Sequence, residues 1–249
     1  MGHDIRISVD TLRGDGIPPA PTSPYDEYYY QGNDQSGDRI ALWFYARVAH
    51  RLAAPGASVL DFGSGVGHFS RRLAQRFDST AYDLSPYARE QTKKTSPSSH
   101  IVDDTAAIAS ASLDLVCSLH VLEHVPDPAA TFREFARLLR PNGRLLYVVP
   151  NPQGWGHRIK QQKWFAYRDP THCSVLSKAA WLAATRDGGF SIERVAADGL
   201  WDAPYVARVP KVIQRPFFGA LAGLQVVLGR VFLPADWGEC LVVFARRQN

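Results

Sequence analysis

The segment from Val59 to Gly67 constrains the fold of this chain more than any other part of the sequence. An apolar run ends at Asp61, and Gly63, Gly65 and Gly67 then alternate with other residues. A buried parallel strand that passes through a tight turn into a helix has this pattern. Glycine allows a positive φ and a close approach of a ligand to the main chain, and N–H groups at a helix start favour an electron-rich ligand. The segment therefore predicts a nucleotide-type cofactor site.

The spacing of these glycines bears on which cofactor binds. The dinucleotide fingerprint is Gly-x-Gly-x-x-Gly, whereas the third glycine here comes one residue earlier and Asp61 precedes the turn. This form resembles the first motif of the class I S-adenosylmethionine-dependent methyltransferases, in which the loop wraps the methionine part of the cofactor. The resemblance implies cofactor-binding roles for Asp61, Gly63, Ser64, Gly65 and Gly67. An NAD site remains the alternative at this stage.

Acidic residues follow the next two predicted strands. Asp83 ends an apolar segment about twenty residues downstream, where a carboxylate can accept both hydroxyls of a ribose. By the resemblance, Asp83 binds the ribose and Leu84 lies beside the cofactor, although NAD enzymes also place an acid here. The resemblance further implies that Asp104 accepts from the adenine amino group, with Asp103 as the neighbouring alternative.

The segment 112–125, SLDLVCSLHVLEHV, distinguishes an S-adenosylmethionine site from an NAD site. It resembles the methyltransferase segment written FDxV…xxLxHV, and a dinucleotide dehydrogenase has no reason to carry it. In the family, the backbone around Leu119 and His120 lies beside the cofactor. The resemblance covers roughly residues 40 to 197 and is strongest to the small-molecule branch, the type 11/12-like methyltransferases.

The remaining pattern predicts an α/β fold. Apolar strands are predicted at 144–150, 190–195 and 239–246, and helices follow the capping residues Asp127 and Ser177. Alternating strands and helices predict a doubly wound sheet with the ligand at the carboxyl ends of the strands. The resemblance implies a Rossmann-like, seven-stranded sheet whose last strand is antiparallel.

Two segments lie outside the core that the resemblance covers. Residues 1–38 are predicted to form a loose arm followed by a tyrosine-rich lid at Tyr25–Tyr30, and residues 39–249 the methyltransferase domain. The tyrosine rings could lie beside a sulfonium cation or simply pack the arm onto the sheet. Within the domain, 200–238 is predicted to be a helical cap insertion, too short in its apolar stretch to span a bilayer. It could instead form a dimer surface or a peripheral membrane contact through 212–233. Five apolar residues recur in it at helical spacing: Phe217, Leu221, Leu224, Leu228 and Val231.

Composition excludes several other classes. The net charge is only +4 and the basic residues form no stripe with aromatics, which argues against a nucleic-acid partner. Three cysteines without CxxC spacing suit the reducing cytoplasm. No HxxxH pair or carboxylate cluster shows ligand spacing, so no metal site is predicted.

The expected activity is methyl transfer to an oxygen atom of a small-molecule acceptor, in secondary-metabolite or glycan and lipid tailoring. N- or C-methylation is the alternative within the fold, and a non-catalytic or NAD-binding Rossmann domain is the alternative from another class. A general base is needed only if the acceptor must lose a proton. His172, in a segment resembling the family's DxTH string, is the first candidate, and His157 and His120 follow.

Overall fold

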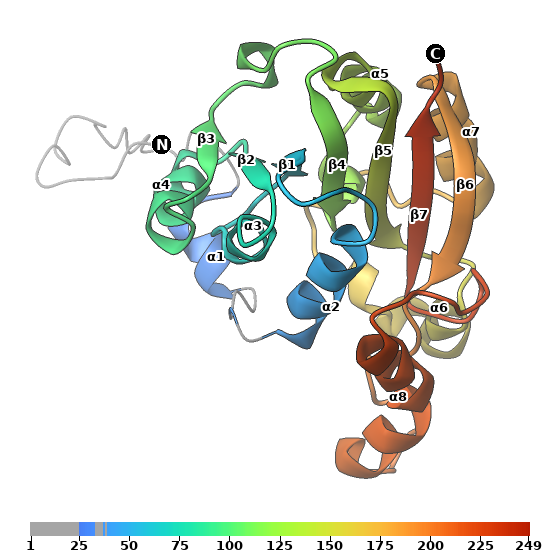
Figure 1. The fold of residues 1–249 in the computed structure, drawn as a ribbon. Coiled ribbons are helices and arrows are strands. Elements are labelled where there is room, and N and C mark those ends of the chain that lie inside the picture. Colours follow the sequence, from blue (N-terminus) through green and yellow to red (C-terminus); the bar gives the residue numbers. More distant parts are fainter. Residues whose placement is uncertain (1–24, 33–36, 38) are drawn as a thin grey trace, which may run out of the picture.

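A central seven-stranded sheet organises the protein (Figure 1). The computed structural model describes residues 25–32, 37 and 39–249, so the predicted arm at 1–24 lies outside the described residues. The strand order is β3-β2-β1-β4-β5-β7-β6, and β7 runs antiparallel to both of its neighbours. The strands are β1 (Ser58–Phe62), β2 (Asp78–Tyr82), β3 (His100–Val102), β4 (Leu113–Leu119), β5 (Leu139–Pro150), β6 (Phe190–Ala197) and β7 (Cys240–Arg247). The predicted Rossmann-like fold with an antiparallel last strand is confirmed.

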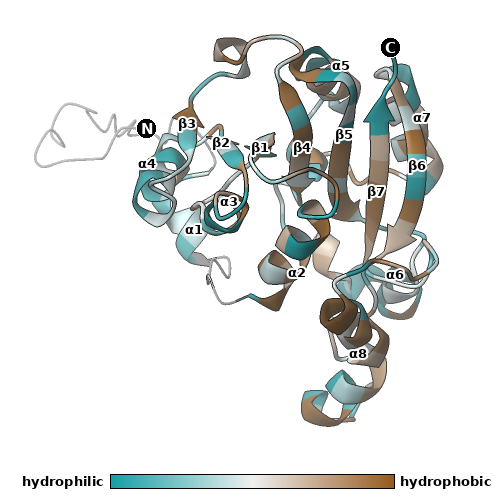
Figure 2. Ribbon diagram, in the orientation of Figure 1, coloured by the Kyte–Doolittle hydropathy of each residue, from teal (hydrophilic) through white to brown (hydrophobic). Residues whose placement is uncertain are grey.

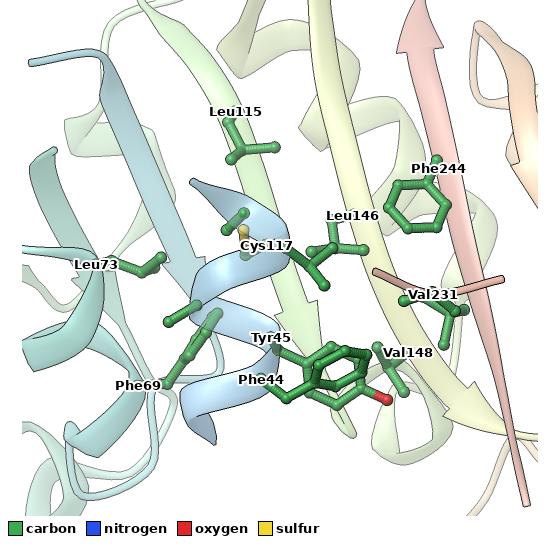
Figure 3. Close-up of a cluster of buried hydrophobic side chains, with 14 of the residues drawn as sticks. Phe44, Tyr45, Phe69, Leu73, Leu115, Cys117, Leu146, Val148, Val231 and Phe244 are labelled. Atoms are coloured by element: carbon green, nitrogen blue, oxygen red, sulfur yellow. The ribbon is translucent and has the colours of Figure 1, made fainter. Parts of the chain in front are cut away.

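Helices cover both faces of this sheet because its strands are apolar on both sides. In β5, Leu146 and Val148 belong to the core under α2 (Ile40–Ala49) and α3 (His68–Leu73), as Figure 3 shows. The alternate residues Leu145, Tyr147 and Val149 belong to the core on the opposite face, which is covered by α5 (Pro128–Leu138) and α7 (Lys178–Asp187). This burial on both faces is the pattern expected of a doubly wound sheet.

The helix boundaries on the second face follow from capping. The Asp127 side chain accepts from the Ala130 N–H (2.9 Å), and Pro128 occupies the first turn of α5. The Ser177 hydroxyl accepts from the Ala180 N–H (3.2 Å), and α7 ends at Gly188. Both predicted helix starts are confirmed.

Several predicted boundaries differ from the structure. Strand β6 continues to Ala197 instead of ending at 195, and β7 spans Cys240–Arg247 instead of 239–246. Strand β5 begins at Leu139 instead of Arg144, because the chain turns into extended backbone directly after α5 and its pairing with β4 shifts register between Leu113 and Leu115. The helix predicted at 39–52 is α2, and it ends at Ala49.

The segment between β6 and β7 contains α8 (Lys211–Leu228), which extends beyond the end of the sheet (Figure 1). The helix stops at Gly229, which is left-handed (φ 58°), so Val231 lies outside the helix and is buried, contrary to the sequence prediction. Arg47 donates to the carbonyls of Val226 and Val227 at 3.1 and 3.3 Å. Arg51 donates to those of Gly229 and Leu228 at 2.7 and 3.0 Å. These guanidinium groups, from α2 and the turn that follows it, satisfy carbonyls that the end of a helix leaves unpaired.

The shorter helices are α1 (Glu27–Gly32), α4 (Pro86–Thr95) and α6 (Trp155–Lys160). Within the described part of the chain, no helix is long and apolar enough to cross a membrane.

Trp181 tests the core beneath α7. Its ring is fully buried against Phe132 and Tyr147, so Trp181→Ala leaves a cavity and should lower the free energy of unfolding by about 3–5 kcal/mol. Trp237 is half exposed, and Trp237→Ala should change this free energy by no more than about 0.5 kcal/mol. Urea denaturation followed by circular dichroism measures both. Equal effects would contradict the assignment of Trp181 to the core.

Candidate active site

A cavity of about 1200 Å³ opens at the carboxyl ends of the parallel strands. Its walls come from the glycine turn after β1, the ends of β2 and β4, the lid helix α1, helix α2, and the inner face of α8. The residues that matter for its chemistry are Tyr25, Tyr29, Tyr30, Asp61, Gly63, Ser64, Gly65, Asp83, Leu84, Leu119, His120, Asp198, Trp201, Tyr205 and Arg215. The cavity therefore joins the predicted cofactor motif to the segments expected to choose the acceptor.

The glycine turn needs glycine for two physical reasons. Gly63, Gly65 and Gly67 have φ values of 82°, 53° and 88°, which residues with a side chain rarely adopt. A Cβ atom at Gly63 would lie 2.2 Å from a methyl group of Val121, and one at Gly67 would lie 2.8 Å from the Thr92 backbone. The turn is thus packed as closely as its backbone allows.

Asp83 connects the turn to the end of β2. Its Oδ2 accepts from the Gly65 N–H (2.8 Å), and its Oδ1 accepts from the Ser85 N–H (2.9 Å). The Tyr30 hydroxyl donates to the same Oδ1 at 3.3 Å. Burial raises the pKa of the Asp83 carboxyl, and the two N–H donors partly oppose this shift. An acid held in this way offers a fixed acceptor to a ligand hydroxyl.

Asp61 lies deeper in the same site. It is almost fully buried, and the Ser70 hydroxyl donates to its Oδ2 at 2.5 Å. Burial raises the pKa of the Asp61 carboxyl to about 7, although the Ser70 hydrogen bond acts against this shift. A cationic ligand group close to Asp61 would favour its ionised form.

Three tyrosines of the predicted lid, Tyr25, Tyr29 and Tyr30, line the cavity. Tyr30 reaches Asp83, and the Tyr29 hydroxyl donates to Asp169 at 3.2 Å. The Ser85 hydroxyl donates to the Tyr25 carbonyl at 2.5 Å. The segment is therefore held against both the β2 end and the loop that carries the DxTH string.

Among the three candidate bases, His120 is the one that lines the cavity. It follows β4 with a φ of 56°, a conformation that costs energy for a residue with a side chain and that concentrates at functional sites. Its Nδ1 lies 3.3 Å from Oε1 of Glu123, whose side chain is fully buried. Neither carboxylate oxygen of Glu123 has a hydrogen bond of good geometry to any described residue.

The other two histidines lie behind the cavity wall. His172 has its Nδ1 2.6 Å from the Ala166 carbonyl, and its ring packs against His124 with 4.6 Å between centroids. His157 has its Nε2 3.2 Å from the Tyr167 hydroxyl. Neither ring belongs to the lining of the cavity, so both are placed to support loops.

Asp104 also lies outside the cavity lining. Its exposed carboxylate accepts from the Ala106 N–H at 2.8 Å and caps the short turn after β3. An adenine-binding role for Asp104 stays a prediction.

Sequence reasoning missed the acid at the end of β6. Asp198 is buried and accepts from the Cys240 N–H (2.8 Å) and the Trp201 Nε1–H (2.5 Å). Burial raises the pKa of Asp198 to about 6. The signal was present, because an acid directly after a strand at the ligand edge is the same pattern that singled out Asp83.

The fold also gathers possible metal ligands that are not neighbours in the sequence. Ligand atoms of Glu123, His124 and His172 lie within 4.8 Å of one another. The spacing argument against a metal site could not find this group, because His172 comes from a distant loop. His124 also contacts the Thr171 hydroxyl through its Nδ1 at 2.9 Å.

Known proteins with similar sequences are methyltransferases. A family model described as a methyltransferase domain matches residues 38–195. The ubiquinone biosynthesis O-methyltransferase of Xanthomonas axonopodis pv. citri is 34% identical over 164 residues, which cover 60% of this chain and 69% of that protein. The one from Xanthomonas campestris pv. campestris strain B100 is 41% identical over 155 residues, which cover 54% of this chain and 64% of that protein. The chain thus spans about two thirds of the length of these relatives.

Solved structures share the fold. A chain from the complex between the Haloferax volcanii Trm112 methyltransferase activator and a putative methyltransferase has a TM-score of 0.64 at 17% identity, covering 90% of this chain and 96% of that chain. An S-adenosylmethionine-dependent methyltransferase from Mesorhizobium loti has a TM-score of 0.56 at 22% identity, covering 85% of this chain and all of that chain.

Gly63→Ala tests the close packing of the turn. The variant should lose stability by about 1–3 kcal/mol and also lose affinity for S-adenosylmethionine, because its methyl group meets Val121 in a left-handed backbone. Gly56→Ala is the matched control, since Gly56 has a φ of 76° but open space around its Cβ position. Adding Val121→Ala should recover part of the loss at Gly63. Equal effects of the two alanine variants, measured by thermal unfolding and calorimetry, would contradict the packing argument.

Asp83→Ala tests the assignment of the ribose site. Loss of a buried charged acceptor should weaken S-adenosylmethionine binding by about 10- to 100-fold while circular dichroism shows a folded protein. Asp103→Ala, at an exposed position outside the cavity lining, should bind normally. An unchanged dissociation constant for Asp83→Ala in calorimetry would refute the assignment.

Proposed function

Because this chain belongs to the methyltransferase domain family and takes its methyl group from S-adenosylmethionine, we propose that its acceptor is the hydroxyl group of a small, partly apolar molecule. The single observation that carries this proposal is the placement of His120, a strained histidine in the cavity wall with a buried carboxylate behind it. The name of the relatives, ubiquinone biosynthesis O-methyltransferase, supports transfer to oxygen.

The residues around the glycine turn fit the cofactor. Gly63 and Gly65 line the cavity and have no side chain, so a ligand can lie directly against their main chain. Asp83 provides a fixed carboxylate for ribose hydroxyls, and Leu84 and Leu119 provide apolar wall. When bound, S-adenosylmethionine supplies a methyl group on a sulfonium that can be displaced in line. We assign cofactor binding to these residues together with Asp61, Ser64 and Gly67.

His120 acts as the general base in this proposal. An acceptor hydroxyl must lose its proton, and a histidine within reach can take it at a gain of about 10²–10⁴ in rate. Glu123 is a positioning residue: its carboxylate lies 3.3 Å from Nδ1 of His120, where its charge stabilises the imidazolium that forms. From the sequence, His172 was the first candidate for the base and His157 ranked with His120. In the structure both His172 and His157 face the loop interior instead.

The acceptor wall differs from the cofactor wall. Trp201, Tyr205 and Phe218 line the cavity from the segment between β6 and β7, which is outside the residues matched by the family model. Flat apolar side chains with a few polar groups suit a small molecule with an apolar body. This supports tailoring of a secondary metabolite, glycan or lipid. Action in the cytoplasm is supported by the cysteines, since all three are free.

His120→Gln tests the base. Turnover with phenolic and aliphatic alcohol acceptors, followed by release of S-adenosylhomocysteine, should fall by about 10²-fold or more while the dissociation constant of S-adenosylmethionine stays the same. His172→Gln is the control and should retain normal turnover. Glu123→Gln should lower kcat without lowering stability, because it removes a buried charge that has no hydrogen bond.

Transfer to nitrogen or carbon makes a different prediction. Such an acceptor can react without losing a proton to the enzyme in the rate-limiting step. If His120→Gln turned over an amine acceptor at the undiminished rate, the assignment would change from O-methylation to N-methylation. If no acceptor class were methylated at all, a catalytic function would be rejected.

A further inference from the structure

Helix α8 exposes an apolar face to solvent. Ile213, Phe217, Leu224 and Val227 recur at intervals of four, seven and three residues, so they lie on one side of the helix. Phe217 is 78% exposed, and Val227 is 72% exposed. Figure 2 shows the hydrophobic colouring of α8 on a helix that extends away from the sheet. A surface of this kind marks an interaction site, since single exposed apolar residues are common but a helical stripe of them is not.

A second face of α8, about 100° around the helix from the apolar stripe, is fixed to the protein. Gln214 is buried and accepts from the N–H groups of Tyr205 and Val206 at 2.6 and 2.9 Å. Gln225, eleven residues later on the same face, accepts from the N–H groups of Phe232 and Leu233 at 2.6 and 3.1 Å. These bonds prevent the helix from turning its outer face inward. The outer face is thus held toward solvent by the fold.

The charge around this face has one sign. No aspartate or glutamate occurs from 203 to 235, although the chain contains 24 acidic residues. Arg208, Lys211 and Arg230 are exposed near the two ends of α8, and Arg215 is exposed on the side of the helix that lines the cavity. Across the described ranges, none of these four cations has a recorded ion pair with another residue. The surface therefore combines an apolar stripe with positive charge that the protein itself does not neutralise.

We propose that the outer face of α8 docks on an anionic lipid bilayer, with the helix lying in the plane of the interface. Apolar side chains would enter the acyl boundary while Arg208, Lys211 and Arg230, near the two ends of α8, contact lipid phosphates. Phe232, which is half exposed directly after the helix, extends the apolar contact. A second copy of the chain fits this face less well, because a symmetric dimer would bring Arg208, Lys211 and Arg230 of both copies together.

The docked orientation has a consequence for the acceptor. Phe218, Ala222 and Val226, on the inner side of α8, line the cavity. One helix would therefore contact the bilayer with one face and the substrate cavity with the other. This step rests on the proposed function and assigns the acceptor to the class of lipid-soluble molecules that partition into the bilayer.

Vesicle sedimentation of the full chain tests the docking. The protein should sediment with vesicles of phosphatidylglycerol and phosphatidylcholine, much less with phosphatidylcholine alone, and less at high salt. Phe217→Gln combined with Leu224→Gln should weaken binding at least about tenfold, since both side chains are exposed and glutamine preserves the helix. Tyr28→Gln is the matched control, because Tyr28 is 84% exposed but lies on α1.

A second double variant tests the contribution of positive charge separately from that of the apolar side chains. Arg208→Glu combined with Lys211→Glu should abolish the preference for anionic vesicles. Equal vesicle binding by the parent and both double variants would overturn the proposal. So would a dimer in sedimentation velocity that Phe217→Gln and Leu224→Gln dissociate while the parent ignores vesicles.

Methyl transfer is measured on the same samples so that the two proposals fail separately. Vesicle binding without transfer to any acceptor would support docking and reject the proposed function. Transfer to an acceptor free in water, by a protein that ignores vesicles, would reject docking alone.

Discussion

The hydrogen bond from the Gly65 N–H to Asp83 is the contact on which the cofactor site depends. It joins the turn after β1 to the end of β2, two neighbouring parallel strands, and so fixes the backbone that a ligand must approach. The bond requires Gly65 in a left-handed conformation and a carboxylate that stays buried at the strand end. The lid, through Tyr30, and helix α4, through Ser85, both attach to the same acid.

Local signals identified this part of the site from sequence. A glycine turn after an apolar strand and an acid after the next strand each depend on residues close together in the chain, so the positions of Gly63 and Asp83 could be predicted. The seven-stranded sheet and the antiparallel β7 followed from family resemblance, whereas the strand order was not predicted. The same strand-end rule would also have selected Asp198, which lies directly after β6 in the cavity wall.

Side-chain direction was harder to predict. His172 stands in a motif-like string, yet its ring faces the loop backbone, whereas His120 reaches the cavity because its own φ is left-handed. A sequence does not state such a dihedral for a residue other than glycine. The grouping of Glu123 with His124 and His172 likewise depends on a distant loop folding back. Val231 fits a helical spacing, but Gly229 ends α8 before it.

The hydrogen bonds from Arg47 and Arg51 to the end of α8 determine how the insertion between β6 and β7 unfolds. A helix that lies outside the common core of its family could open as a separate low-stability unit. Here Arg47 on α2, a helix packed against the sheet, and Arg51 just after this helix donate to the last carbonyls of α8. The carboxyl-terminal turns of α8 therefore share the cooperativity of the central domain, while its amino-terminal turns are tied only to the loop that Gln214 closes. One end of the insertion is therefore held by the central domain, and the other end is held by the insertion's own loop.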